Sequence, residues 1–387
     1  LQGTLRLPRS GPSRAPARFT ITPKGEGQGV ISAVVLKDNN FVLLLTLKLG
    51  VGAAQTTPMV DVQPQSRPLA GAHGLQPRDL NLLIEPSTDG FKITATGAFV
   101  STATLPLREA ALAQMIDRTR QALFSIVDTK DSASGRKVYQ AGIDIPADIN
   151  RQSLKTLARV GWQLYQGLFF GPAADAQANR FGTWLRRLAQ TDTLKIQIVS
   201  NQFLMPWGLL YVADRFDENN IAPEMFLGLK HIIEHLPLQT SDNPPGQTIP
   251  TQPTFTVSVN VNKDIDTQFH TTIIADQVAF WTGIKDAHLA DVVVRATKAE
   301  VVQALADTAT PDQLVYFYCH AGAPAANDPL GPAGAALFLT GSERLTLDDL
   351  QTAAPATDQL AGAPLVFINA CESADLSPLF YNGFMPY

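Results

Sequence analysis

The spacing of apolar residues divides the chain into segments of different type. In the first third, short runs rich in β-branched and aromatic residues are separated by turn-forming residues, which is typical of β-hairpins. The turn residues are Asp38, Asn39 and Asn40 in one place and Asp89 and Gly90 in another. This pattern predicts a small β-rich module over residues 17–105.

From residue 106 the apolar spacing changes to that of helices. Residues 112, 115, 116, 119 and 123 fall on one helical face, and residues 154, 157, 161, 164 and 168 fall on another. Residues 194–200 alternate as a strand does. We expect residues 106–240 to form a supporting α/β subdomain, which ends in a proline-rich linker near residues 238–253.

The last third alternates between strand and helix patterns. Strands are expected at residues 255–261, 291–295, 314–320 and 364–371, and helices at 274–282 and 298–308. Thr297 and Glu300 have the spacing of a capping box at the start of the second helix. Such alternation predicts an α/β fold over residues 254–387, in which helices cover both faces of a mainly parallel sheet.

Two of these strands end on reactive side chains, His320 and Cys371. In α/β sheets the chemistry lies just beyond the carboxyl ends of parallel strands, so neighbouring strands would bring an imidazole and a thiol together. A free thiol is mostly protonated at neutral pH, and a nearby imidazole raises its thiolate fraction. The pattern therefore favours a cysteine nucleophile with a histidine base. A buried Cys that packs as a small apolar residue, with a structural His at a strand end, is compatible with the same sequence.

The residues around both positions resemble a known family. Residues 316–322 and 366–373 are similar to the His and Cys motifs of CHAT peptidases, the caspase-like cysteine proteases of the clan that includes caspases and separases. Residues 336–341 and 345–350 resemble the hairpin and the short helix between those motifs. The resemblance covers roughly residues 105–387 and is strongest from about residue 254. It implies a caspase-like sheet, with a related supporting subdomain before it.

The resemblance also implies a mechanism. His320 and Cys371 would form a catalytic dyad, and the backbone N–H groups of Gly322 and Cys371 would bind the oxyanion. Ala321 stands where the family usually has Gly. Near the Cys, Glu372 and Asp375 are candidates to line a pocket for a basic substrate residue, or are simply solvated acids.

The same resemblance implies partners. The substrate would be a protein, activity would be regulated by a sensor, a partner or proteolytic processing, and bacterial defence would be the setting. Caspase-like folds continue after the Cys with a helix and further strands, whereas this sequence ends at Tyr387. We therefore expect a separate C-terminal fragment or subunit to complete the sheet.

Two other functions are compatible with the sequence. The first is a caspase-like scaffold that binds partners and has no activity. The second is a zinc hydrolase, because His231, Glu234 and His235 match the H-x-x-E-H pattern of two zinc ligands and a base on one helix. Cys319 adjoins His320, and strand alternation predicts that it packs in the core rather than in the site.

Composition excludes several classes. A net charge of −5 gives no electrostatic reason for nucleic-acid binding, and the longest apolar stretch is too short to span a membrane. Two cysteines, one of them a candidate nucleophile, favour a reducing cytoplasm. Residues 1–16, rich in Arg and Pro, are expected to form a flexible tail. We expect no cofactor and no metal.

Overall fold

The computed structural model describes residues 17–52, 75–132, 135–141, 144–200, 203–236, 252–322, 334–353, 360 and 362–371, and for residues 59–64, 140, 141, 347, 351 and 371 the backbone only. The chain divides into two units, residues 1–77 with 238–247, and residues 78–237 with 248–387. The tail predicted for residues 1–16 lies outside the described residues.

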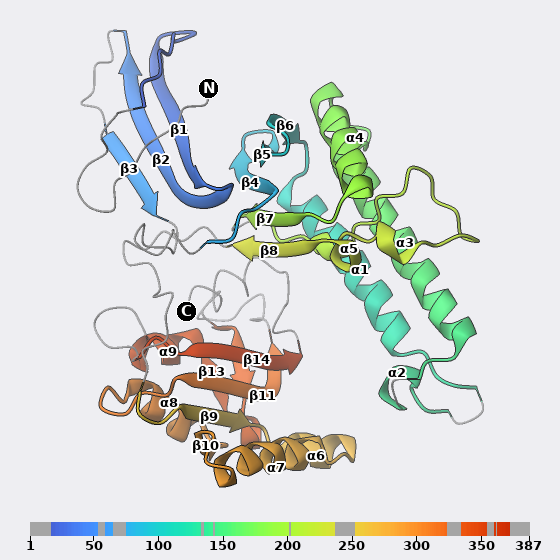
Figure 1. The fold of residues 1–387 in the computed structure, drawn as a ribbon, viewed down its shortest axis with the longest axis vertical. Coiled ribbons are helices and arrows are strands. Elements are labelled where there is room, and N and C mark those ends of the chain that lie inside the picture. The colour runs from blue at the N-terminus through green and yellow to red at the C-terminus, as the bar shows by residue number, and fades with distance from the viewer. Residues whose placement is uncertain are drawn as a thin grey trace. The chain divides into compact units, whose positions relative to one another are not determined.

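The first unit contains a three-stranded antiparallel sheet (Figure 1). Its strands are β1 (Gly27–Lys37), β2 (Asn40–Val51) and β3 (Met59–Pro64), in that order. Asp38 and Asn39 form the turn between β1 and β2 with φ angles of 49° and 59°. Two successive residues with positive φ are typical of the tight hairpin turn, and Asn and Asp tolerate that conformation well. The first predicted hairpin is confirmed.

A five-stranded sheet follows, in the order β6-β5-β4-β7-β8. Its strands are β4 (Leu80–Ser87), β5 (Gly90–Gly97), β6 (Ser101–Leu105), β7 (Lys195–Val199) and β8 (Ile232–Leu236). Because β4 pairs with β7 in parallel, the strands expected in one module over residues 17–105 are divided between two sheets. The physical reason is that residues 80–84 are buried on both faces, as in an interior strand.

Three long helices pack against one face of this sheet, namely α1 (Glu109–Val127), α3 (Ala147–Phe169) and α4 (Ala176–Thr191). The helix α4 was not expected from the sequence. Its signal is Asp175, whose carboxylate accepts hydrogen bonds from the N–H groups of Gln177 and Ala178. Shorter elements complete this part: α2 (Val138–Ala141), η2 (Trp207–Leu209), η3 (Pro223–Met225) and α5 (Leu227–Lys230).

The C-terminal sheet contains a parallel core of β10 (Asp291–Arg295), β9 (Thr256–Val261), β11 (Leu314–Gly322) and β14 (Leu365–Cys371). The antiparallel hairpin of β12 (Ala336–Phe338) and β13 (Arg344–Thr346) contacts the end of β11, and η5 (Thr340–Ser342) connects its strands. Since β14 pairs along residues 314–320, β9 and β12 share the other edge of β11.

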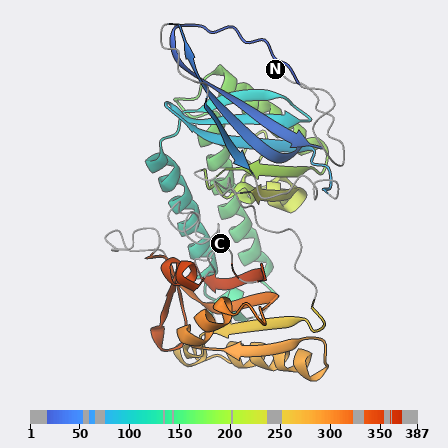
Figure 2. The same ribbon diagram turned by 90° about the vertical axis from the view of Figure 1, so that its left-hand side faces the viewer.

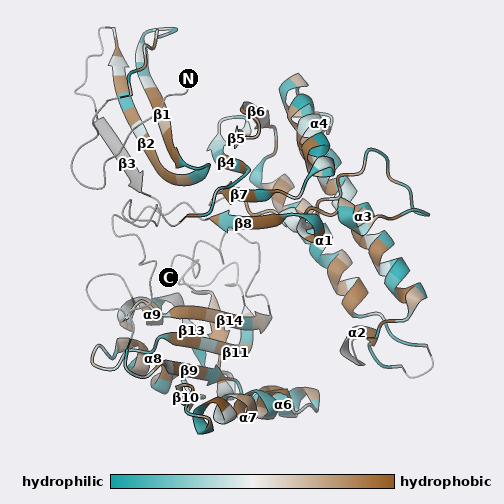
Figure 3. Cartoon of the chain, in the orientation of Figure 1, coloured by the Kyte–Doolittle hydropathy of each residue, from teal (hydrophilic) through white to brown (hydrophobic). Residues whose placement is uncertain are grey.

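Helices cover both faces of this sheet, which confirms the predicted α/β class (Figure 2). One face packs against α6 (Asp264–Phe269) and α7 (Ile273–Asp286), and the other against α8 (Lys298–Ala306) and α9 (Leu347–Ala353). Figure 3 shows the apolar character of β11 and β14 between these layers. The capping box of Thr297 and Glu300 is present at the start of α8, as predicted.

Among the described residues, no helix has the length and apolar character that crossing a membrane requires.

Candidate functional site

The structure places His320 and Cys371 at the same register position on adjacent parallel strands. The Cα of His320 is paired with that of Cys371, the last pair in the ladder between β11 and β14. Residues paired in this way share a face of the sheet, and adjacent strands lie about 4.8 Å apart. The backbone thus brings the two predicted catalytic positions together at the carboxyl end of the sheet.

The imidazole of His320 contacts two consecutive residues of α6. Its Nε2 lies 3.2 Å from Oε1 of Gln268. The ring of Phe269 lies 5.8 Å from the imidazole, centroid to centroid, at an interplanar angle of 58°. Phe269 is 60% exposed, so much of the ring faces solvent beside His320. No element was expected between residues 261 and 274, and neither residue was identified from the sequence, because a six-residue helix has too little periodicity to be recognised.

Hydrogen bonds fix the start of α6 to the end of β9 and to η5. The side chain of Asn262 donates to the carbonyl of Phe338 and accepts from the N–H of Asp264, at 3.0 and 2.9 Å. The carboxylate of Asp264 in turn accepts from the N–H of Gly341 at 2.7 Å. The helix that carries Gln268 is therefore connected to the hairpin beside His320.

Asp266, in the first turn of α6, connects this helix to the start of α7. Its carboxylate accepts hydrogen bonds from the N–H groups of Ile274 and Ala275 and from the hydroxyl of Thr271. Partial desolvation raises the pKa of Asp266, but these donors outweigh it and hold the pKa below its ordinary value. The sharp change of direction after α6 occurs at His270, which has a φ of 52°.

Cys319 lies on the opposite face of β11 from His320. It is 3% exposed and belongs to the apolar cluster beneath α8 and α9. Tyr316 lies four residues before His320 and so on the same face of the strand as His320, and it packs with α7 instead. The predicted core position of Cys319 is confirmed.

The two residues whose backbone N–H groups are predicted to bind an oxyanion are both paired with residues of a neighbouring strand. Gly322 is paired with Ala336 of β12, and Cys371 with His320. The carbonyl of Tyr318 accepts from the N–H of Asn262 on the β9 side, so strand alternation directs the N–H of Gly322 toward β12. Oxyanion binding by Gly322 stays a prediction, and it requires this end of the hairpin to open.

Other parts of the predicted site lie outside the described residues. They are Glu372, Asp375 and the side chain of Cys371. Their roles stay predictions.

The H-x-x-E-H segment folds differently from the zinc motif. Residues 232–236 form β8, so His231 and His235 lie roughly 13 Å apart along an extended chain instead of one helical turn apart. Nδ1 of His231 accepts a hydrogen bond from the N–H of Leu194, and Glu234 pairs with Arg78 at 2.8 Å. Burial lowers the pKa of His235 to about 4. This geometry contradicts the expectation of two zinc ligands on one helix.

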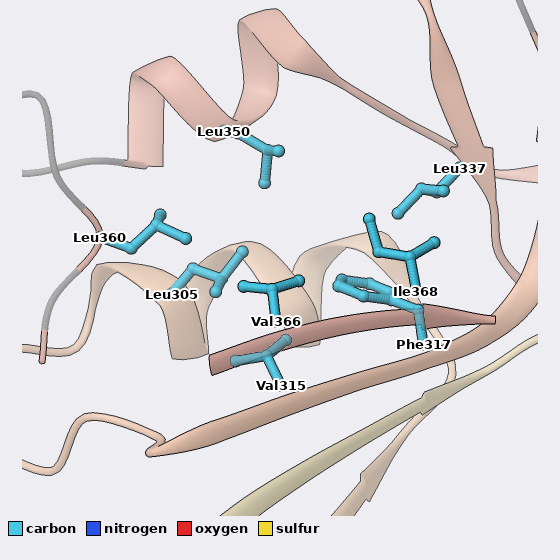
Figure 4. A pocket seen from close by; sticks show the side chains of 8 residues that line it. All are labelled: Leu305, Val315, Phe317, Leu337, Leu350, Leu360, Val366 and Ile368. Carbon is cyan, nitrogen blue, oxygen red and sulfur yellow. The ribbon is translucent and has the colours of Figure 1, made fainter. Parts of the chain in front are cut away.

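A separate apolar cavity lies between the sheet and helices α8 and α9 (Figure 4). Its volume is about 40 Å³, and every side chain that lines it is apolar: Leu305, Val315, Phe317, Leu337, Leu350, Leu360, Val366 and Ile368. Such a lining offers a water molecule no hydrogen-bond partner. The cavity is on the face opposite His320, so we assign it to packing.

Filling this cavity is expected to stabilise the C-terminal sheet. Val315→Ile adds one methylene group toward the cavity and should raise the free energy of unfolding by about 0.5–1 kcal/mol, the reverse of a typical Ile-to-Val loss. Urea unfolding followed by the fluorescence of Trp281 would measure the change. The matched control is Val259→Ile, which crowds the packed cluster on the other face and should cost about 1–3 kcal/mol. A loss of stability in Val315→Ile would contradict the prediction.

Comparison with known proteins does not assign the chain to a family. No protein-family model matches the chain, and no curated protein matches it.

Proposed function

We propose that this protein is a caspase-like cysteine endopeptidase, with Cys371 as nucleophile and His320 as general base. The in-register pairing of positions 320 and 371 at the carboxyl ends of adjacent parallel strands carries this proposal. It supports the same pair of residues that the CHAT resemblance implies. A neutral imidazole within reach of a thiol accepts its proton and so supplies the thiolate that attacks carbonyl carbon.

The proposed reaction needs only these two side chains and water. The Cys371 thiolate attacks the scissile carbonyl carbon, and the carbonyl π electrons move to oxygen. When the C–N bond breaks, the imidazolium of His320 gives its proton to the leaving amine. His320 then takes a proton from water, whose oxygen attacks the acyl-enzyme, and the proton returns to the sulfur as the carboxylic acid leaves.

A partner that covers β14 is part of the proposal. Within the described residues, β14 pairs on one side only, with β11. Its Leu365 and Phe367 are 57% and 56% exposed. Apolar side chains on an edge strand favour the addition of a further strand. We propose that a C-terminal segment or separate subunit pairs with β14. The other proposed partners are a protein substrate and a regulatory protein.

Selective labelling of Cys371 tests the catalytic proposal. The full chain is treated with a peptidyl electrophile, and mass spectrometry follows modification of both cysteines. We expect Cys371 to react at least 100-fold faster than Cys319, which is 3% exposed and serves as the internal control. His320→Ala should slow the reaction of Cys371 by about 10²-fold, in the range of a lost general base.

Two outcomes would oppose the proposal. If His320→Ala leaves the rate at Cys371 unchanged, His320 does not activate the thiol. If native Cys371 reacts no faster than an ordinary exposed thiol such as that of glutathione, the non-catalytic scaffold becomes the better explanation. One feature favours the non-catalytic scaffold. Gly322 and Cys371 are both paired with neighbouring strands, so their two backbone N–H groups are not both available to bind a substrate oxyanion.

A further inference from the structure

We propose that Gln268 is a positioning residue, which holds His320 in the tautomer that carries its proton on Nε2. The inference rests on the proposed function, because it concerns the base of the same dyad. With Nε2 occupied, the lone pair of the neutral ring lies on Nδ1, which becomes the atom that accepts the proton of Cys371. The CHAT resemblance identified two catalytic residues, and the proposed role of Gln268 is to orient one of them.

The hydrogen bond itself carries the first step. The amide oxygen of Gln268 lies 3.2 Å from Nε2 of His320, within hydrogen-bond distance. An amide oxygen only accepts, so the imidazole must donate from Nε2. A hydrogen bond to one ring nitrogen is the usual way in which proteins select the tautomer of a reactive histidine.

The second step is that Gln268 sits on a fixed element. Asn262 and Asp264 connect the start of α6 to the hairpin, and Asp266 connects the helix to the start of α7. Phe269, next to Gln268, packs its ring against the imidazole at 5.8 Å. One turn of α6 thus supplies both the acceptor at Nε2 of His320 and an aromatic ring beside the imidazole.

The third step concerns charge. A carboxylate in the place of Gln268 would also accept from Nε2, but it would add a negative charge close to the thiolate that forms at position 371. The carboxamide fixes the same tautomer without that repulsion. The choice of an uncharged acceptor therefore suits a base whose partner becomes an anion.

The test uses the ¹⁵N NMR spectrum of the imidazole groups in the full chain, with the His320 signals assigned by their loss in His320→Gln. We expect the native protein to show His320 protonated at Nε2 at neutral to alkaline pH. Gln268→Ala should move these signals toward a mixture of the two tautomers. It should also slow modification of Cys371 by iodoacetamide about tenfold, the lower end of the effect of losing an orienting hydrogen bond.

Two further variants separate orientation from a general disturbance. Gln268→Glu keeps an acceptor and should retain the Nε2-protonated signals. Gln277→Ala is the matched control, because Gln277 lies on the adjacent helix α7 and accepts from the hydroxyl of Tyr316 at 3.1 Å. It should leave the His320 signals unchanged. Gln268 is exposed, so its replacement by Ala removes no core packing.

The outcomes distinguish this inference from the proposed function. If Gln268→Ala leaves both the tautomer and the reaction of Cys371 unchanged, the inference is overturned, even when Cys371 depends on His320. If Gln268→Ala shifts the tautomer but native Cys371 is no more reactive than a free thiol, Gln268 orients His320 and the peptidase proposal fails. A tautomer protonated at Nδ1 in the native protein would also overturn the inference.

Discussion

Replacing Cys371 by Ala is expected to lower the rate of peptide-bond hydrolysis by about 10³-fold or more, because no other group can form the acyl-enzyme. The measurement is cleavage of a fluorogenic peptide library by the full chain, together with any segment that binds to β14. The loss should appear in kcat/KM for every peptide that the native protein cleaves.

Cys319→Ala is the matched control for this experiment, since it removes the only other sulfhydryl group of the chain. Cys319 lies in the cluster beneath α8 and α9, and its loss should leave kcat/KM within about threefold. Cleavage by Cys371→Ala at the native rate would refute the assignment. An equal loss in both cysteine variants would point to a disturbed fold instead of a lost nucleophile.

The second large effect is expected from Asp312→Ala. Nη1 of Arg295 lies 3.1 Å from Oδ2 of Asp312, and the two side chains are only 15% and 8% exposed. Removing the carboxylate leaves a guanidinium group poorly solvated and without its counter-ion, which should reduce the free energy of unfolding by about 3 kcal/mol. Urea unfolding followed by Trp281 fluorescence would measure the loss. Asp291→Asn is the control, because its pair with Lys285 is half exposed, and it should change stability by about 0.5 kcal/mol or less.

The pair as a whole is not expected to be strongly stabilising. Desolvation raises the pKa of Asp312 and outweighs the lowering effect of Arg295. A carboxyl whose pKa is raised by folding stabilises the protein most below its unfolded pKa, and this contribution is lost as the pH rises through the folded value. Burial therefore costs the ionised form free energy at neutral pH. The double variant Arg295→Met with Asp312→Leu should accordingly lose much less stability than Asp312→Ala, and an equal loss would contradict this account.

The sequence predicted the C-terminal sheet better than the rest of the chain. The strands that carry His320 and Cys371, the capping box at Thr297 and the burial of Cys319 all follow from local patterns, although β11 continues two residues beyond the predicted end at His320. Parallel interior strands are continuous apolar runs, and such runs can be recognised without knowledge of their neighbours. The register in which β11 pairs with β14, which brings positions 320 and 371 together, could be seen only in the folded structure.

The failures arise where the decisive interaction is distant in sequence. β4 and β5 form the hairpin that the sequence predicted, but β4 also pairs with β7 across more than a hundred residues, and no local pattern shows that these strands belong to a separate sheet. His231 and His235 have the spacing of a helical motif, but that spacing fits a strand equally well. Gln268 approaches His320 across 52 positions, and a single glutamine has no pattern that marks it as an orienting group.

The alternation of side chains along β11 has a consequence for protein engineering. Phe317 and Cys319 pack beneath α8 and α9, while His320 contacts α6 from the other face of the same strand. The layer formed by α8 and α9 can therefore be redesigned for thermal stability without replacing any residue that touches the imidazole. Conversely, α6 can be varied to tune reactivity while the larger apolar layer remains intact.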